Sequence, residues 1–368
     1  MKFAVLEYTS KSGKIWKHTS QKPNYLADPD KEIDPTSFGC YVSAFEGEHI
    51  PLKELILDVA TPLQLARRMY RKFTRHWPEN YDISYLTQFD VLLVVHQISD
   101  GHEITSLVKR LNKRSHRPYI IGVPTQPFGL LQQYWNTHPD WLADFQQFMN
   151  ACDVFLTIVK STLPTWQQMT STPVVYAPQP YPVEHATSFF QPQASKNATL
   201  FVAGVTDRPN IALGFKVAAA LQRKHPEYMI HVTTTPGHTQ DFSNLTGSTF
   251  KAQSFLPWQE QLQYLSRVKL VINTDYTATR GRVQTDCAAV GTPSIGADSD
   301  AQHDLYPDFH ADAQTPFESL VEQGEGLLTN QALYEKTVIT AAEGLKKYTY
   351  KNTKQNLIDI MNTYPKRV

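Results

Sequence analysis

Short, nearly continuous apolar runs alternate with helical segments along this chain, and that alternation constrains the fold more than any other feature. The run 89–97, FDVLLVVHQ, has the uninterrupted apolar character of a parallel strand covered on both faces. Strands joined by helices form right-handed βαβ units and therefore a parallel sheet. In the first half we expect strands at 2–8, within 40–58, and at 89–97, 117–124, 152–159 and 174–178, with helices at 62–76, 102–115 and 136–151.

A second series of the same kind begins at 198–205, after the segment 180–197, which lacks periodicity and is rich in Pro, Ser and Gln. The sequence therefore predicts an α/β protein with two Rossmann-like domains facing a cleft, at 1–185 and 186–350. Further strands are expected at 228–234, 268–275 and 292–297, and helices at 210–225, 258–267, 282–290, 315–328, 331–345 and 351–363.

The overall charge and the cysteine pattern exclude several classes of protein. Lys plus Arg and Asp plus Glu number 35 each, so no global field attracts nucleic acid or anionic lipid. Three scattered cysteines in no metal-binding spacing indicate free thiols in a reducing compartment. No apolar stretch approaches the roughly 20 residues of a membrane span, and we expect a soluble, cytoplasmic protein.

The stretch 270–297 carries the most chemistry. A buried strand leads into a loop with Gly281, and then into a helix that bears Asp286. In open α/β sheets ligands lie beyond the carboxyl ends of the strands, where helix N-termini present N–H groups. A phosphate there could take charge from Arg280 or Arg282, and Asp286 could accept hydrogen bonds from a ribose diol. Taken singly, each of these residues is more often structural or a solvated surface charge than functional.

This stretch resembles the signature of family-4-type glycosyltransferases of the GT-B fold. The match runs from Asp286 to Ile295 through Gly291-Thr292-Pro293, with Asp in place of the family's ribose-binding Glu. Ala278 occupies the position of the signature's first Glu. The resemblance implies a nucleoside-diphosphate-sugar donor in the C-terminal domain, and a terminal segment, 351–368, that crosses back to the N-terminal domain.

Upstream segments extend the resemblance over about 198–300. They place Arg208 where a diphosphate-binding cation belongs and Pro257 in the loop that flanks the nucleobase. Gly13, after the first strand, resembles the glycine loop that approaches the diphosphate. GT-B enzymes generally need no metal, and no DxD motif follows a strand here. We therefore expect no metal or other cofactor, with arginines and helix dipoles stabilising the leaving diphosphate.

In the fold implied by the resemblance, the acceptor binds to the N-terminal domain. His96 ends the 89–97 run and Asp100 follows it, so either could accept the proton of an acceptor hydroxyl. A structural histidine at a strand end is an equal alternative for His96. The expected acceptor is a carbohydrate or a lipid-linked sugar, while the nucleotide base, the sugar and the stereochemical outcome stay open.

Two basic segments, 62–76 and 102–117, are expected to be solvated helix faces, or else contacts to a membrane surface or to DNA. The DNA alternative has a motif behind it, because the segment Arg282 to Asp286 resembles the R-V-x-E helix of phage-type DNA glucosyltransferases. After the transferase acting on a carbohydrate or lipid-linked acceptor and the DNA glycosyltransferase, the third possibility is a non-catalytic nucleotide-sugar-binding protein, since Ala278 replaces an acidic residue of the signature. A GT-B epimerase is the fourth, although it would need additional carboxylates near the sugar.

Overall fold

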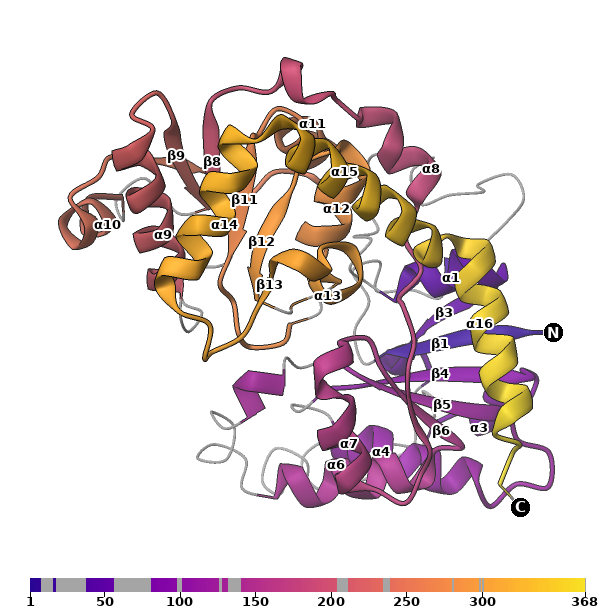
Figure 1. The fold of residues 1–368 in the computed structure, drawn as a ribbon. Coiled ribbons are helices and arrows are strands. Elements are labelled where there is room, and N and C mark those ends of the chain that lie inside the picture. Colours follow the sequence, from indigo (N-terminus) through magenta and orange to yellow (C-terminus); the bar gives the residue numbers. More distant parts are fainter. Residues whose placement is uncertain are drawn as a thin grey trace.

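A computed structural model of the chain describes residues 1–7, 16–17, 38–55, 81–97, 101–125, 128–131, 140–203, 211–233, 239–279, 281–297, 299 and 301–367. Two predominantly parallel sheets, each covered by helices, form two halves that lie next to each other (Figure 1). This architecture confirms the predicted fold class of two Rossmann-like units. The boundaries 1–185 and 186–350 remain predictions.

Among the described residues, the first sheet has seven strands, all in parallel pairs except β2, which pairs antiparallel with β3. In sheet order they are β2 (Trp16–Lys17), β3 (Glu48–Pro51), β1 (Phe3–Glu7), β4 (Val91–His96), β5 (Tyr119–Pro124), β6 (Val154–Thr157) and β7 (Val174–Tyr176). The α-helices of this half are α1 (Gly39–Phe45), α3 (Ile83–Leu86), α4 (Gly101–Leu111), α6 (Trp141–Ala151) and α7 (Leu163–Met169).

In the part of this half that the structure describes, the second sheet has six strands, all parallel. In sheet order they are β10 (Phe250–Gln253), β9 (Met229–Thr233), β8 (Thr199–Ala203), β11 (Leu270–Asn273), β12 (Ser294–Ala297) and β13 (His310–Ala311). Its helices are α9 (Ile211–Lys224), α10 (Thr239–Thr246), α11 (Trp258–Leu265), α12 (Val283–Val290), α13 (Gln302–Leu305), α14 (Phe317–Thr329) and α15 (Gln331–Leu345). The short α8 (Val183–Ala186) lies in the connection between the two sheets.

The strand β4 shows why its sequence is apolar at every position. Leu92 and Val94 belong to the core on the side of α4 and α6, whereas Leu93 and Val95 belong to the core on the side of α1. Alternate side chains of a strand point to opposite faces, so a strand covered on both faces needs apolar residues throughout.

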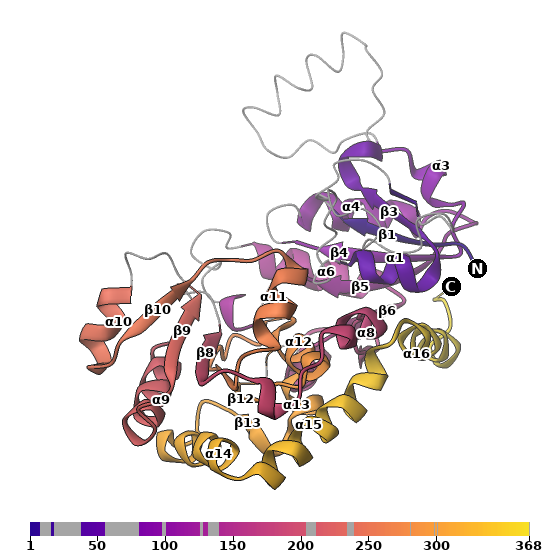
Figure 2. The same cartoon turned by 90° about the horizontal axis from the view of Figure 1, so that it is seen from above.

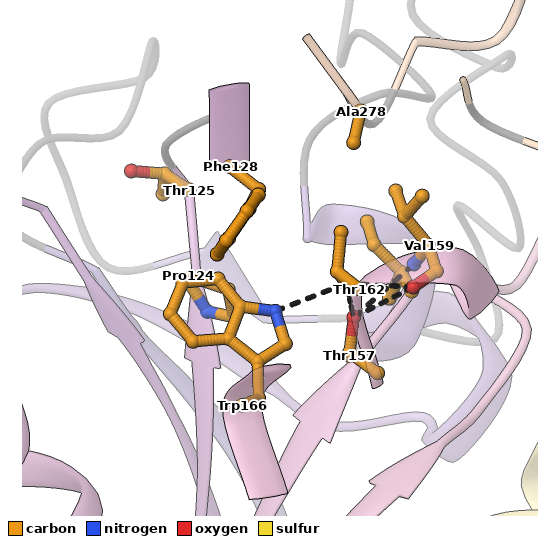
Figure 3. A pocket seen from close by; sticks show the side chains of 9 residues that line it. Pro124, Thr125, Phe128, Thr157, Val159, Thr162, Trp166 and Ala278 are labelled. Carbon is orange, nitrogen blue, oxygen red and sulfur yellow. Dashed lines mark hydrogen bonds between the residues drawn. The ribbon is translucent and has the colours of Figure 1, made fainter. Parts of the chain in front are cut away.

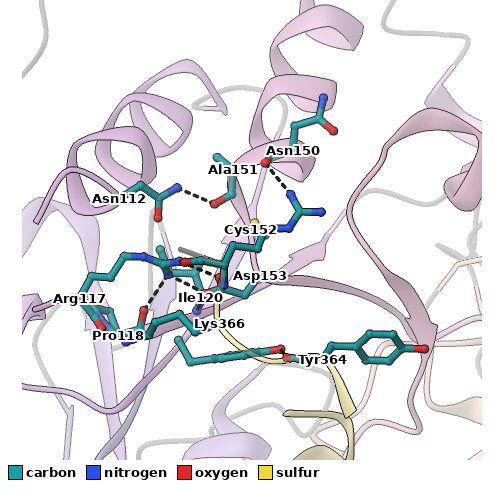
Figure 4. Close-up of polar contacts among 12 residues, drawn as sticks. Asn112, Arg117, Pro118, Ile120, Asn150, Ala151, Cys152, Asp153, Tyr364 and Lys366 are labelled. Carbon is teal, nitrogen blue, oxygen red and sulfur yellow. Dashed lines mark hydrogen bonds and ion pairs between the residues drawn. The ribbon is translucent and has the colours of Figure 1, made fainter. Parts of the chain in front are cut away.

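The C-terminal helix α16 (Tyr350–Thr363) packs on the first half, beside α1 (Figures 1 and 2). Leu357 and Ile360 are buried in the same cluster as Phe3 of β1. Beyond this helix the backbone N–H of Arg367 donates to Asp153 at 2.8 Å. Asp153 is also held by Arg117 through two hydrogen bonds of 2.6 and 2.7 Å (Figure 4). The end of the chain is thus fastened to the first sheet by a buried ion pair.

A second polar cluster joins the two halves near α13. The Asp304 carboxylate accepts hydrogen bonds from Tyr176 at 2.5 Å and from Tyr348 at 3.3 Å. Lys160, which follows β6, lies 3.7 Å from the same carboxylate. Because only 8% of the Asp304 side chain is exposed, these contacts are partly shielded from solvent.

Two sequence-based predictions of local structure were wrong or incomplete. The segment 40–58 contains a strand, β3, as predicted, but its first part belongs to α1 (Gly39–Phe45), every residue of which is buried. Between the predicted strand 228–234 and the predicted helix 258–267, where the sequence indicates no helix or strand, the chain forms α10 and the edge strand β10. The predicted helix 62–76 lies outside the described residues.

Candidate functional site

The carboxyl ends of β5 and β6 face the loop that follows β11, and a small pocket of about 20 Å³ lies between them (Figure 3). The first half contributes Phe128 and Trp166 to its wall, and the second half contributes Ala278. The two halves also touch directly, because the Gly129 N–H donates to the Thr277 carbonyl at 2.8 Å. A Cβ at Gly129 would lie 2.6 Å from the Thr277 Cα, so this close approach requires glycine.

The wall contributed by the first half contains polar residues that hydrogen-bond to one another. The Trp166 indole N–H donates to the Thr162 hydroxyl at 3.0 Å, and that hydroxyl lies 2.7 Å from the Thr157 hydroxyl. Each threonine hydroxyl also lies within hydrogen-bond distance of the Val159 carbonyl, Thr157 at 3.0 Å and Thr162 at 2.7 Å. Their hydrogen-bonding groups are therefore used within the wall (Figure 3).

The facing edge of the second sheet is polar and buried. The Asn273 amide donates to Ser299 at 2.9 Å, and the Gln284 amide donates to the same hydroxyl at 3.2 Å. The carboxylate of Asp275 accepts the Thr277 N–H at 2.9 Å. Gln284 Oε1 is buried and has no hydrogen-bond partner among the described residues. Such a network holds the loop after β11 in one conformation.

Ala278 has an unusual backbone within this loop. Its φ is +51°, in the left-handed region that non-glycine residues seldom adopt. This is the position where the family signature carries its first Glu. Backbone strain of this kind persists only where the surrounding contacts impose it, and it concentrates at functional sites.

Asp286 lies in the first turn of α12, as the sequence predicts, but it is 1% exposed. Its Oδ1 accepts hydrogen bonds from the Tyr181 hydroxyl at 2.6 Å and from the Trp258 indole N–H at 2.9 Å. Its Oδ2 lies 3.5 Å from Nε of Arg282. Burial raises the pKa of Asp286, and Arg282 and the two donors oppose that shift.

The starts of α11 and α12 carry three of the predicted site residues. Arg282 is the N-cap of α12, and Pro257 is the N-cap of α11, directly before Trp258. The structure therefore brings Arg282, Asp286 and Pro257 into one neighbourhood. Sequence reasoning missed Tyr181 and Trp258, since neither lies in the matched signature and Tyr181 is 105 residues from Asp286.

His96 ends β4, as predicted, but its imidazole is enclosed rather than open to the pocket. It is 2% exposed, packs on Phe145 and Phe148, and lies 3.9 Å from Asp144. Its Nε2 has no hydrogen-bond partner among the described residues. Burial lowers the pKa of His96, while Asp144 acts in the opposite direction. A catalytic role for His96 stays a prediction.

Four predicted site residues, Gly13, Asp100, Arg208 and Arg280, lie outside the described residues. Within the part of the chain that is described, no group of three or more His, Cys, Asp or Glu side chains is arranged to hold a metal ion. No described helix is long and apolar enough to cross a membrane.

The basic segment 102–117 is less uniform than its sequence indicates. Arg117 is paired with the buried Asp153, and Lys109 donates to the Gln147 side chain at 2.6 Å. Lys113 and Arg114 are exposed. The contacts with a membrane or with DNA remain predictions.

No family model matches the sequence, and no curated protein matches it. Solved structures are similar over nearly the whole chain at low sequence identity. Sucrose-phosphate synthase from Thermosynechococcus elongatus has a TM-score of 0.63 at 11% identity, covering 98% of this chain and 98% of its own. Trehalose-6-phosphate synthase from E. coli, bound with UDP-2-fluoro glucose, has a TM-score of 0.61 at 11% identity and 100% coverage of both chains. The protein thus has the GT-B fold of nucleotide-sugar glycosyltransferases, as the resemblance in its sequence predicts.

Proposed function

We propose that this protein is a glycosyltransferase that moves a sugar from a nucleoside-diphosphate sugar to a carbohydrate or lipid-linked acceptor. The observation that carries the proposal is the position of the signature stretch within the fold. Residues 270–297 form the polar edge of the second sheet, and their loop faces the carboxyl ends of β5 and β6. This is the edge at which open α/β sheets bind their ligands.

On the donor side, Arg282 is the cation whose position the structure supports best. Asp286 and the first turn of α12 hold it, and its side chain is 19% exposed. A guanidinium there, next to a helix N-terminus, suits a diphosphate. Arg208 and Arg280 are proposed to assist, and Gly13 to approach the diphosphate from the opposite domain.

The ribose contact proposed for Asp286 requires a rearrangement. Its Oδ1 already accepts two hydrogen bonds, so a ribose hydroxyl must reach Oδ2, which now lies beside Arg282. A donor that draws Arg282 toward its phosphates would free that oxygen. Pro257, exposed at the start of α11, is then placed to flank the base.

On the acceptor side, His96 and Asp100 are the proposed proton acceptors. His96 would act only if α4 shifted, because Gly101 packs against its imidazole and leaves no room for a substituent. Glycosyltransferase acceptors bring a hydroxyl that must lose its proton as the glycosidic bond forms.

A thermal-shift panel of UDP-, GDP-, ADP- and CMP-sugars tests the donor class. A ligand at a concentration of 100 Kd stabilises a protein by about 2.7 kcal/mol, which is a readily measured shift. We expect one nucleotide class to stabilise the wild type and to lose its effect in Arg282→Ala. Lys113→Ala, which removes an exposed cation from the first half of the molecule, is the matched control. If no nucleotide sugar stabilises the protein, the proposal is wrong.

A further inference from the structure

A hollow of about 420 Å³ lies outside the cleft, on the face of the second sheet that α11 covers only in part. His231 of β9 and Thr199 of β8 line it from the sheet. The neighbours of His231 in the same strand, Ile230 and Val232, are buried in the core on the other side of the sheet, where Phe215 of α9 packs. The hollow is therefore distinct from both the core and the pocket between the halves.

Polar side chains around this hollow have unused hydrogen-bonding capacity. Along its rim Asn197, Glu260, Gln263 and Arg267 are exposed, and their side chains make no hydrogen bond or ion pair with other described residues. They offer amide, carboxylate and guanidinium groups, which together supply both donors and acceptors.

His231 adds a fixed and unsatisfied group. Its Nδ1 lies 2.8 Å from the Tyr264 hydroxyl, and the two rings stack with centroids 6.0 Å apart. Its Nε2 is buried and has no partner among the described residues. Burial, and to a lesser extent Lys251, lowers the pKa of His231. Of the charged residues that line the hollow, Glu260 and Arg267 balance each other, while Lys251 lies outside its lining.

We propose that this hollow binds a neutral saccharide unit. Its volume falls in the range of small-molecule sites, about 300–1,000 Å³. A ligand with many hydroxyl groups can both donate to Glu260 and accept from Arg267 and the amides, with an aromatic ring beside it. A phosphorylated ligand would need an excess of positive charge in the lining. An apolar ligand would displace water from these polar side chains without offering them new hydrogen bonds, which costs free energy.

Saturation-transfer NMR with the full chain and maltose, with glucose as a second probe, tests the site. We expect saturable binding that Glu260→Ala/Gln263→Ala weakens at least tenfold, because both exposed side chains face the ligand. Arg223→Ala, an exposed change on α9 at the other face of the sheet, should change the affinity less than twofold. Equal binding by the double variant and the wild type would overturn the proposal, as would an absence of binding by either sugar.

A second arm separates this site from the cleft. Saturating UDP should leave maltose binding unchanged, since the nucleotide is proposed to contact Pro257 and the first turn of α12, whereas the saccharide is proposed to contact Glu260 and Gln263 further along α11 and Arg267 just after it. Competition by UDP, or tighter binding of inorganic phosphate than of maltose, would contradict a neutral saccharide site here. The assay needs no turnover, so its outcome is independent of the proposed glycosyl transfer.

Discussion

The carboxyl edges of the two sheets face each other but differ in character. On the first sheet, Thr157, Thr162 and Trp166 form hydrogen bonds among themselves, and none of the described residues that line the pocket from this edge is charged. On the second sheet, Asn273 and Gln284 belong to a buried polar network beside Arg282. Under the proposed function, the second edge would hold the charged nucleotide sugar, and the first edge would position the acceptor and exclude water.

The largest expected effect is a loss of stability when Gly296, in β12 at the polar edge of the second sheet, is replaced by alanine. Gly296 has φ +127°, and a Cβ there would lie 1.9 Å from the Asn273 carbonyl oxygen. Gly296→Ala should therefore force β12 away from β11 and cost more than about 4 kcal/mol in the free energy of unfolding. Denaturant unfolding checks this. Gly247→Ala, with φ +72° and nothing within 4 Å, is the control and should cost about 1 kcal/mol. Similar losses in both variants would show that the strands do not approach so closely.

The next effect tests the contact between the edges. Gly129→Ala should push the two halves apart, because the new Cβ would meet the Thr277 backbone. Displacement of about 1 Å at a reacting centre can reduce turnover about 100-fold. We expect turnover to fall by about that factor while donor affinity, measured by calorimetry, changes little. A variant with wild-type turnover would mean that the spacing of the edges does not matter.

A smaller effect, on donor affinity, distinguishes a substitution at the second edge from one at the first. Asp286→Asn keeps the hydrogen bonds from Tyr181 and Trp258 but removes the charge beside Arg282. Donor affinity should drop about tenfold, or about 1.4 kcal/mol, because loss of a charge-assisted partner costs about 1–3 kcal/mol. Trp166→Phe, at the edge of the first sheet, should leave donor affinity within twofold of the wild-type value. If both variants bind the donor equally well in titration calorimetry, the proposed difference in role between the two edges is wrong.

The last effect is a pH dependence of stability at the first edge. Burial lowers the pKa of His96 below that of the unfolded chain, so the unfolded state binds more protons as the pH falls below about 6.5. Wild-type stability should therefore decrease from pH 7 to pH 5, by at most about 1.4 kcal/mol per pH unit from this residue. The groups facing His96 are Asp144, Phe145 and Phe148.

His96→Gln removes this titration and should flatten the profile, as measured by urea unfolding across the same range. Parallel profiles for the variant and the wild type would indicate that the imidazole is solvated and charged in the folded protein.

Much of the fold could be predicted from the sequence because strands covered on both faces, such as β4 and β11, are apolar at nearly every position. The prediction failed where that signal was short or was overridden. In β10 only Phe250 of four residues is buried. In α1, β-branched and aromatic residues form a helix because α16, about 310 residues further on, packs against it.

The site was predictable where neighbours in the sequence determine it, as in the pairing of Arg282 with Asp286. The burial of Asp286 was not, because Tyr181 and Trp258 reach it from other segments. The resemblance to the family signature carries no information about such long-range contacts. For the same reason His96 could be placed at a strand end, but its enclosure by α6 could not.

Glycosyl transfer itself is tested most directly by mixing the protein with the nucleotide sugar that stabilises it and measuring the release of nucleoside diphosphate. The account predicts release in the wild type, faster with a carbohydrate acceptor present, and at least tenfold slower release in Arg282→Ala. Tight binding of a nucleotide sugar with no release of nucleoside diphosphate, with or without acceptors, would contradict the claim and identify a binding protein instead.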